Sequence, residues 1–198
     1  MSSASGAHIK GSAILGFVEW YGSYFGREAV TEVAATANAT LDADLDTASA
    51  TLGILPTRWY PAEVVHLILD GLSERLSATE LDAVCHDAAE DAVEKAMSGL
   101  FKAAFDLLVT PERYAKYIQR FWNRMHDTGV RRIDIVQPGF ARSYVTEWPG
   151  HHPHLCQLTM QTMGAVFRRM GCRDVRVIRV QCVSHGAAQC QAAVRWDP

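Results

Sequence analysis

The chain has 198 residues, of which 48% are hydrophobic and 21% are charged, a composition that fits one ordinary globular domain and excludes a disordered, collagen-like or coiled-coil chain. The net charge of -3 conceals a split, because residues 1–108 carry 6 basic and 16 acidic side chains whereas residues 109–198 carry 13 and 6. No apolar run approaches the roughly eighteen residues of a membrane span. With no recognisable export signal, the five cysteines do not indicate a disulfide framework, and we expect a cytoplasmic protein.

The pattern predicts a single domain over residues 8–198, preceded by a disordered lead. Residues 1–7 are small and polar and offer nothing to bury. The domain divides by charge into an acidic helical part, 8–108, and a basic part, 109–198.

The acidic part is predicted to be mainly helical. Ser77 and Glu80 match a capping box, in which each side chain accepts a hydrogen bond from the other's exposed backbone N–H group. The predicted elements of this part are a short strand over 9–15 and helices over about 17–38, 61–76 and 81–108.

The basic part changes from helical to strand periodicity along the chain. Thr110 and Pro111 begin a helix with an aromatic stripe that ends by Gly129, and apolar residues then alternate with polar ones on both sides of a turn at Pro138. The remaining elements are strands over about 133–136 and 140–148, a helix over 153–170, and strands over 174–184 and 188–196. The order predicts an α+β fold, with N-terminal helices followed by an antiparallel sheet built from two hairpins that flank a helix.

Two cysteines are predicted to face each other in the last hairpin. A turn centred on Gly186 places Cys182 directly opposite Cys190, with Cβ atoms about 5 Å apart, and Cys156 lies on the preceding helix. The same register pairs Val180 with Ala192 and Ile178 with Val194. Three thiolates favour zinc, although no fourth ligand is evident. The alternatives are that the cysteines are ordinary core side chains or that Cys182 and Cys190 form a reversible disulfide.

A run of histidines, His151, His152 and His154, is a second metal candidate. Adjacent residues on a loop rarely point at one position, so we expect these side chains to mark the exposed start of a helix instead.

The motifs resemble those of an uncharacterised paralogous family that is abundant in myxobacteria. They are Leu55-Pro56-x-x-Trp59-Tyr60-Pro61, the aromatic helix that ends in glycine, and Cys182-x-x-x-Gly186-x-x-x-Cys190 leading to Val194-x-Trp196; the likeness covers about 9–196. Residues 100–196 also resemble a wider superfamily of 4-vinyl reductase domains, haem-NO-binding domains and TRAPP transport-complex subunits.

The second resemblance implies an often dimeric fold whose interior accepts a hydrophobic small molecule or acyl chain. In the 4-vinyl reductase-type sensors of aromatic compounds, three cysteines and a glutamate hold zinc, which makes Cys156, Cys182 and Cys190 metal-ligand candidates. Arg179 stands where the acidic ligand is expected, and we expect it to point away from Cys182. The haem-binding relatives carry a proximal His and a Tyr-x-Ser-x-Arg signature; the signature is absent here, which disfavours haem.

These observations favour a non-enzymatic sensor or adaptor domain that binds an apolar ligand, forms a homodimer and acts on a protein partner. Candidate acid-base residues are scattered, and no catalytic set is evident. The aromatic helix and its neighbours supply the candidate ligand-binding residues. They are Phe101, Phe105, Tyr114, Tyr117, Phe121, Trp122, Met160, Met163 and Phe167, which could also simply be core.

The alternative function is a protein-protein interaction module without a ligand, in which the acidic and basic halves supply complementary surfaces. Nucleic-acid binding by the basic half is less favoured, because the net charge is negative and no helix-turn-helix or base-stacking motif is present.

Overall fold

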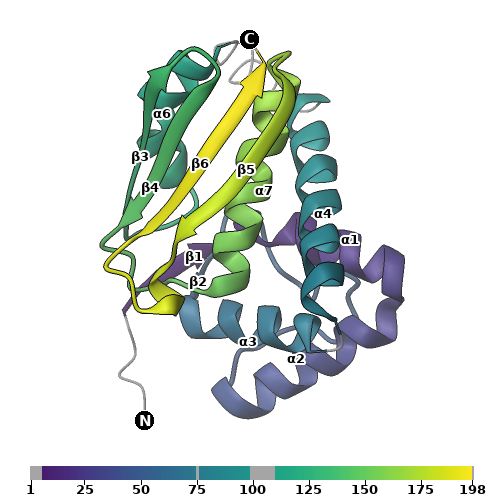
Figure 1. The fold of residues 1–198 in the computed structure, drawn as a ribbon. Coiled ribbons are helices and arrows are strands. Elements are labelled where there is room, and N and C mark those ends of the chain that lie inside the picture. Colours follow the sequence, from purple (N-terminus) through teal and green to yellow (C-terminus); the bar gives the residue numbers. More distant parts are fainter. Residues whose placement is uncertain (1–5, 75, 99–109, 198) are drawn as a thin grey trace.

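The computed structural model of the chain describes residues 6–74, 76–98 and 110–197 (Figure 1). Mainly helical residues precede two antiparallel hairpins that flank a helix, as the sequence predicts, which confirms the α+β class. The elements are β1 (His8–Lys10), α1 (Leu15–Phe25), α2 (Arg27–Leu41), β2 (Trp59–Pro61), α3 (Ala62–Ser73), α4 (Ala78–Ser98), α6 (Pro111–Trp122), β3 (Val130–Gln137), β4 (Phe140–Thr146), α7 (Pro153–Arg169), β5 (Arg173–Gln181) and β6 (Cys190–Asp197). None of the helices within the described residues is both long enough and apolar enough to cross a membrane.

The N-terminal segment is more ordered than the sequence suggests. Ala7 falls in the predicted lead, yet it is buried and its carbonyl accepts a hydrogen bond from the Ala62 N–H group; residues 1–5 lie outside the described residues. Strand β1 is shorter than predicted and pairs with β2, so that Ile9 lies opposite Tyr60. The single helix expected over 17–38 is two helices, because Gly26 adopts φ 91°, a left-handed backbone that favours glycine.

The capping box predicted at Ser77 and the helix start predicted at Thr110 are both confirmed. The Ser77 N–H group donates to the Glu80 carboxylate at 2.8 Å, and the Glu80 N–H group donates to the Ser77 hydroxyl at 3.3 Å. At the start of α6, the Thr110 hydroxyl accepts from the Arg113 N–H group. Helix α6 ends at Trp122, earlier than predicted. Of the helix predicted over 81–108, the last part lies outside the described residues.

The main sheet has the strand order β3-β4-β6-β5. Its two hairpins, β3-β4 and β5-β6, are joined by antiparallel pairing of β4 with β6. Helices α6 and α7 lie against the same face of this sheet, and α4 packs on α7 (Figure 1). The core between them includes the fully buried side chains Trp122, Met163 and Phe167.

The predicted register of the last hairpin is wrong by one residue. Val177, not Ile178, lies opposite Val194, and Arg179 lies opposite Ala192. A register shift follows between Arg179 and Gln181. A one-residue slip reverses the face of every side chain, and Ile178 and Val180 are accordingly 53% and 55% exposed. The shift restores the pairing near the turn and leaves Cys182 fully buried.

Helices α2 and α3 approach so closely that Gly71 has no room for a side chain. A Cβ atom at Gly71 would lie 2.8 Å from Cγ2 and 2.9 Å from Cγ1 of Val33. We expect Gly71→Ala to lower the free energy of unfolding by about 1–3 kcal/mol through overpacking, measured by urea denaturation. In a Val33→Ala background, where the clashing methyl groups are gone, the same substitution should cost much less. An equal cost in both backgrounds would contradict this account.

Candidate metal centre

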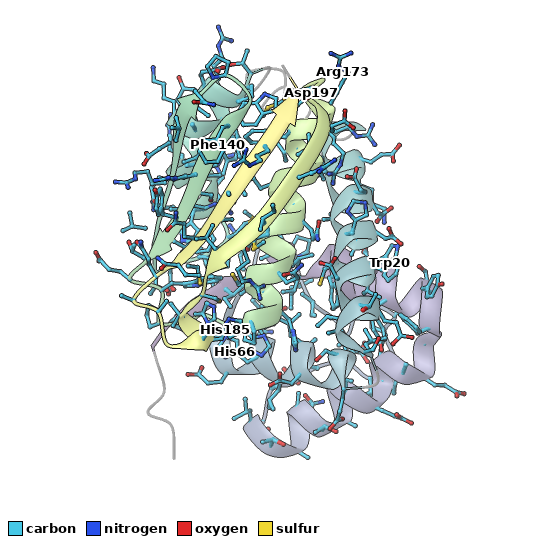
Figure 2. The ribbon with its side chains drawn as sticks, viewed as in Figure 1. Trp20, His66, Phe140, Arg173, His185 and Asp197 are labelled. Carbon is cyan, nitrogen blue, oxygen red and sulfur yellow. The ribbon has the colours of Figure 1, made fainter. Side chains whose placement is uncertain are left out.

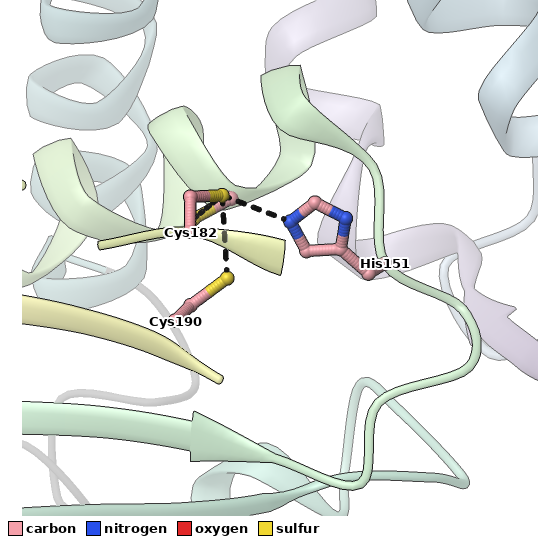
Figure 3. Close-up of side chains that lie close together, drawn as sticks. His151, Cys182 and Cys190 are labelled. Atoms are coloured by element: carbon pink, nitrogen blue, oxygen red, sulfur yellow. Dashed lines mark hydrogen bonds between the residues drawn. The ribbon is translucent and has the colours of Figure 1, made fainter. Parts of the chain in front are cut away.

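Three thiols and one imidazole meet at the end of the main sheet where the β5-β6 hairpin turns. Cys182 directly follows β5, Cys190 begins β6, and Cys156 lies in the first turn of α7. His151 lies in the loop between β4 and α7 and reaches the same place (Figure 3). The expectation that Cys182 and Cys190 are neighbours is therefore confirmed, with Cys156 beside them.

The spacing of these four side chains suits one tetrahedral ion. His151 Nε2 lies 3.3 Å from Cys182 Sγ, Cys182 Sγ lies 3.4 Å from Cys190 Sγ, and Cys182 Sγ lies 3.9 Å from Cys156 Sγ. All four ligand atoms lie within 4.8 Å of one another. In a tetrahedral zinc site with bonds of 2.0–2.3 Å, ligand atoms are separated by roughly 3.3–3.8 Å. The four side chains are thus arranged as a metal would require.

One of the sulfur atoms, that of Cys190, is placed to carry negative charge. Hydrogen bonds from Cys156 are the main reason that the pKa of Cys190 falls well below its usual range, and His151 and the Val183 N–H group also stabilise this thiolate. The Ser184 hydroxyl donates to Cys182 Sγ at 3.2 Å. Donors of this kind around thiolates are a usual feature of zinc sites, in which they orient and tune the ligands.

The sequence analysis did not include His151 with the cysteines as a candidate fourth ligand. The loop that carries it contains Glu147 at φ 50°, followed by Pro149 and Gly150, and its path cannot be read from periodicity. The edge of the His151 ring lies against Trp148, with ring centroids 5.1 Å apart. The available signal was a histidine five residues ahead of Cys156 at a helix start.

The neighbouring histidines point elsewhere, which corrects the interpretation of His151, His152 and His154 as one exposed run. His152 is buried and donates from Nε2 to the Asp70 carboxylate at 2.9 Å, while its Nδ1 accepts from the His154 N–H group. His154 Nε2 is hydrogen-bonded to the Ser73 hydroxyl at 2.8 Å. Asp70, His152 and His154 are close enough to hold a second ion. However, both nitrogens of His152 are already engaged, so these residues form a hydrogen-bonded junction with α3.

Arg179 does not point away from the site, contrary to expectation. Because of the shifted register it faces α7, where its Nη2 atom donates to Gln157 Oε1 at 2.6 Å. Its positive charge acts to lower the pKa of Cys156, although hydrogen bonding to Cys190 and burial raise that pKa overall.

The predicted apolar ligand-binding residues are mostly core. Phe101 and Phe105 lie outside the described residues, and Tyr117 and Phe121 are partly buried. Tyr114, Trp122, Met160, Met163 and Phe167 are buried. Met160 and Met163 border a cavity of about 20 Å³, enough for a single water molecule.

Comparison with solved structures shows which known fold this chain resembles. The chain is similar to H-NOX domains over 96% of its length. One is an H-NOX protein used to probe haem distortion (TM-score 0.69, 8% identity, 96% of that chain). A second is an Fe(II) unliganded H-NOX variant from K. algicida (TM-score 0.69, 11% identity, 97% of that chain). A third is an oxygen-binding H-NOX domain related to soluble guanylate cyclases (TM-score 0.64, 7% identity, 96% of that chain).

At these identities the comparison defines an H-NOX-like fold. No family model and no curated protein matches the sequence. The similarity to haem-NO-binding domains therefore concerns the fold, and the comparisons do not support the narrower likeness to a myxobacterial family, to 4-vinyl reductase domains or to TRAPP subunits.

The described residues do not fit a haem, the group named for some of these structures. Ligand pockets of drug-sized molecules measure about 300–1,000 Å³, far above the 20 Å³ cavity beside α7. Two larger hollows, of about 510 and 420 Å³, have no histidine among the described residues that line them. His126 is buried, but its ring is stacked on Trp122 with centroids 3.9 Å apart. We therefore derive no role through haem.

Proposed function

We propose that this chain is a non-enzymatic sensor domain with an H-NOX-like fold, in which a zinc ion replaces haem as the responsive group. The ligands are His151, Cys156, Cys182 and Cys190. The observation that carries the proposal is the convergence of three buried thiols and one imidazole, from four separate segments, within 4.8 Å. Soft thiolates with an imidazole in tetrahedral array favour zinc over magnesium or calcium.

The number of candidate ligands supports a non-catalytic role. A catalytic zinc keeps one position open for water or substrate, whereas a site with four protein ligands is closed. All four positions of a tetrahedral ion are taken by this chain's own side chains. Bound zinc would then stabilise the fold, and occupancy of the site would depend on the zinc concentration. No substrate would be transformed.

The site is connected to the helical half through the loop that carries His151. His66 Nε2 lies 3.1 Å from the Gly150 carbonyl, and His152 and His154 bond to Asp70 and Ser73. Figure 2 shows His66 and His185 at the same end of the molecule. Three hydrogen bonds thus link residues 150–154 to α3, so that fixing His151 on a metal also fixes the surface on which α3 rests.

The decisive experiment is native mass spectrometry of the freshly purified protein, which reports metal, retained ligand and subunit number together. We expect one zinc per chain, and with Co²⁺ in its place the absorption bands of a tetrahedral thiolate complex. A protein with five free thiols that takes up no zinc at micromolar concentration would overturn the proposal. Loss of two hydrogens from the intact mass would instead indicate the disulfide between Cys182 and Cys190.

Removal of zinc should loosen α3. In hydrogen-exchange measurements, we expect chelation to increase amide exchange in residues 62–73 and in the loop 149–154, because the loop then loses one of its anchors. Exchange in residues 136–141, at the turn of the β3-β4 hairpin and at the opposite end of the sheet from Cys190, serves as the internal control and should stay unchanged. Equal increases throughout the chain would indicate global destabilisation and contradict a directed connection to α3.

The predicted apolar ligand, the homodimer and the protein partner stay predictions. A thermal-shift panel of phenols and fatty acids tests the first, and the subunit number tests the second. The protein-protein interaction module remains the alternative function; a dimer that dissociates in high salt and binds neither zinc nor ligand would favour it.

A further inference from the structure

A buried cation without a counter-charge lies beside the candidate metal centre. Arg131 on β3 is only 6% exposed. Among the described residues no carboxylate pairs with it, and its Nε atom is buried without a hydrogen-bond partner. Its guanidinium lies over the Trp122 ring, 5.6 Å from the centroid. An unpaired buried charge strongly destabilises a folded protein, so the position of Arg131 requires an explanation.

Two thiols that can supply negative charge share a small cavity with Arg131. Arg131, Ser143, Cys156 and Cys190 together line the cavity of about 20 Å³, so space for about one water molecule separates the guanidinium from the sulfur atoms. Burial lowers the pKa of Arg131, and Tyr114 and Cys156 act in the opposite direction. The interaction between guanidinium and thiol is therefore favourable when the thiol is ionised.

A second arginine approaches Cys156 from the opposite edge of the sheet. Arg179 lies on β5, whereas Arg131 lies on β3, and these are the two edge strands of the sheet. The Nε atom of Arg179 is also buried without a partner. Two cations thus act on the same small group of thiols.

We propose that Arg131, assisted by Arg179, is the counter-charge of the zinc-thiolate centre. This inference rests on the proposed function. Three thiolates, one Zn²⁺ and a neutral imidazole leave one net negative charge, so the loaded centre is an anion. A cation beside it does not repel the ion but stabilises the negatively charged complex. Arg131 is accordingly a positioning residue, not a ligand.

The test compares Arg131→Met, which keeps the length of the side chain without its charge, with Arg131→Lys. Zinc affinity is measured by competition with a chromogenic chelator. We expect Arg131→Met to bind zinc about 10–100-fold more weakly, the range typical of groups around the ligands, and Arg131→Lys to retain most of the affinity. Arg179→Met should weaken binding by a smaller factor. The melting temperature of metal-free Arg131→Met should equal or exceed that of the metal-free parent, because an unpaired buried charge has been removed.

Each alternative result is distinguishable. If the parent binds zinc and Arg131→Met binds it equally well, the inference fails and the proposed function stands. If metal-free Arg131→Met fails to fold, Arg131 has a structural role and the inference also fails. If the parent itself takes up no zinc, the proposed function fails.

Discussion

Replacing Cys182 by Ser is expected to abolish zinc binding and the stability that depends on it. Cys182 is fully buried, and its Sγ atom lies 3.3 Å from His151, 3.4 Å from Cys190 and 3.9 Å from Cys156. A ligand that binds only the folded state stabilises it by about 4 kcal/mol when its free concentration is a thousandfold above the dissociation constant. The parent protein should therefore melt at a clearly lower temperature after chelation, whereas Cys182→Ser should melt at the same temperature with and without chelator.

Two cysteines outside the cluster supply matched controls. Cys85 is buried on α4, and burial raises the pKa of its thiol to about 12; Cys172 is half-buried after α7. Cys172→Ser should retain one zinc per chain, and Cys85→Ser should show only the modest cost of placing a hydroxyl in the core. Retention of zinc by Cys182→Ser, or its loss from Cys172→Ser, would contradict the assignment of the ligands.

The sequence predicts the sheet-forming half well because its signals are local. Alternation of apolar residues and the turn glycines place both hairpins. In the helical half, the capping box predicted at Ser77 is a local signal of the same kind and is also present in the structure. The helix break at Gly26 depends on the glycine itself, because the space around the position of its missing Cβ atom is open. The register shift after Arg179 was not predictable from local signals. This shift reversed the expected faces of Ile178 and Val180 while leaving the two cysteines together.

The metal centre was predictable in part for the same reason. Cys182 and Cys190 are symmetric about Gly186, and the predicted register holds next to the turn, where Gln181 pairs with Gln191, so the two thiols meet. Cys156 follows from the position of the helix. His151 lies in an irregular loop that contacts Trp148 and α3, so its place beside the thiols depends on tertiary structure, and the sequence offers only its position five residues ahead of Cys156.

Acid is expected to destabilise this protein through a histidine that is not one of the candidate metal ligands. His126 is buried between Trp122 and Trp148, and its Nδ1 atom has no partner among the described residues. Burial lowers its pKa to about 3, with the charge of Arg131 acting in the same direction and that of Asp127 against it. Since the ordinary pKa of a histidine is 6.5, the unfolded chain takes up a proton below that pH while the folded chain does not. Stability is therefore unaffected above pH 6.5 and is lost progressively as the pH falls from there towards 3.

The size of this loss makes it measurable above other acid effects. One pKa unit corresponds to about 1.4 kcal/mol, so the full effect is on the order of 4–5 kcal/mol, equivalent to one extra proton bound by the unfolded state. In His126→Phe, which keeps a stacked ring, urea denaturation with chelator present should show a slope of unfolding free energy against pH that is smaller by one proton between pH 6 and about 4. His185→Gln, at an exposed position, is the control and should leave the slope unchanged. Because chelator is present throughout, metal binding does not contribute to either slope. Identical slopes for the parent and His126→Phe would mean that His126 is protonated in the folded protein and that the aromatic stack opens to water.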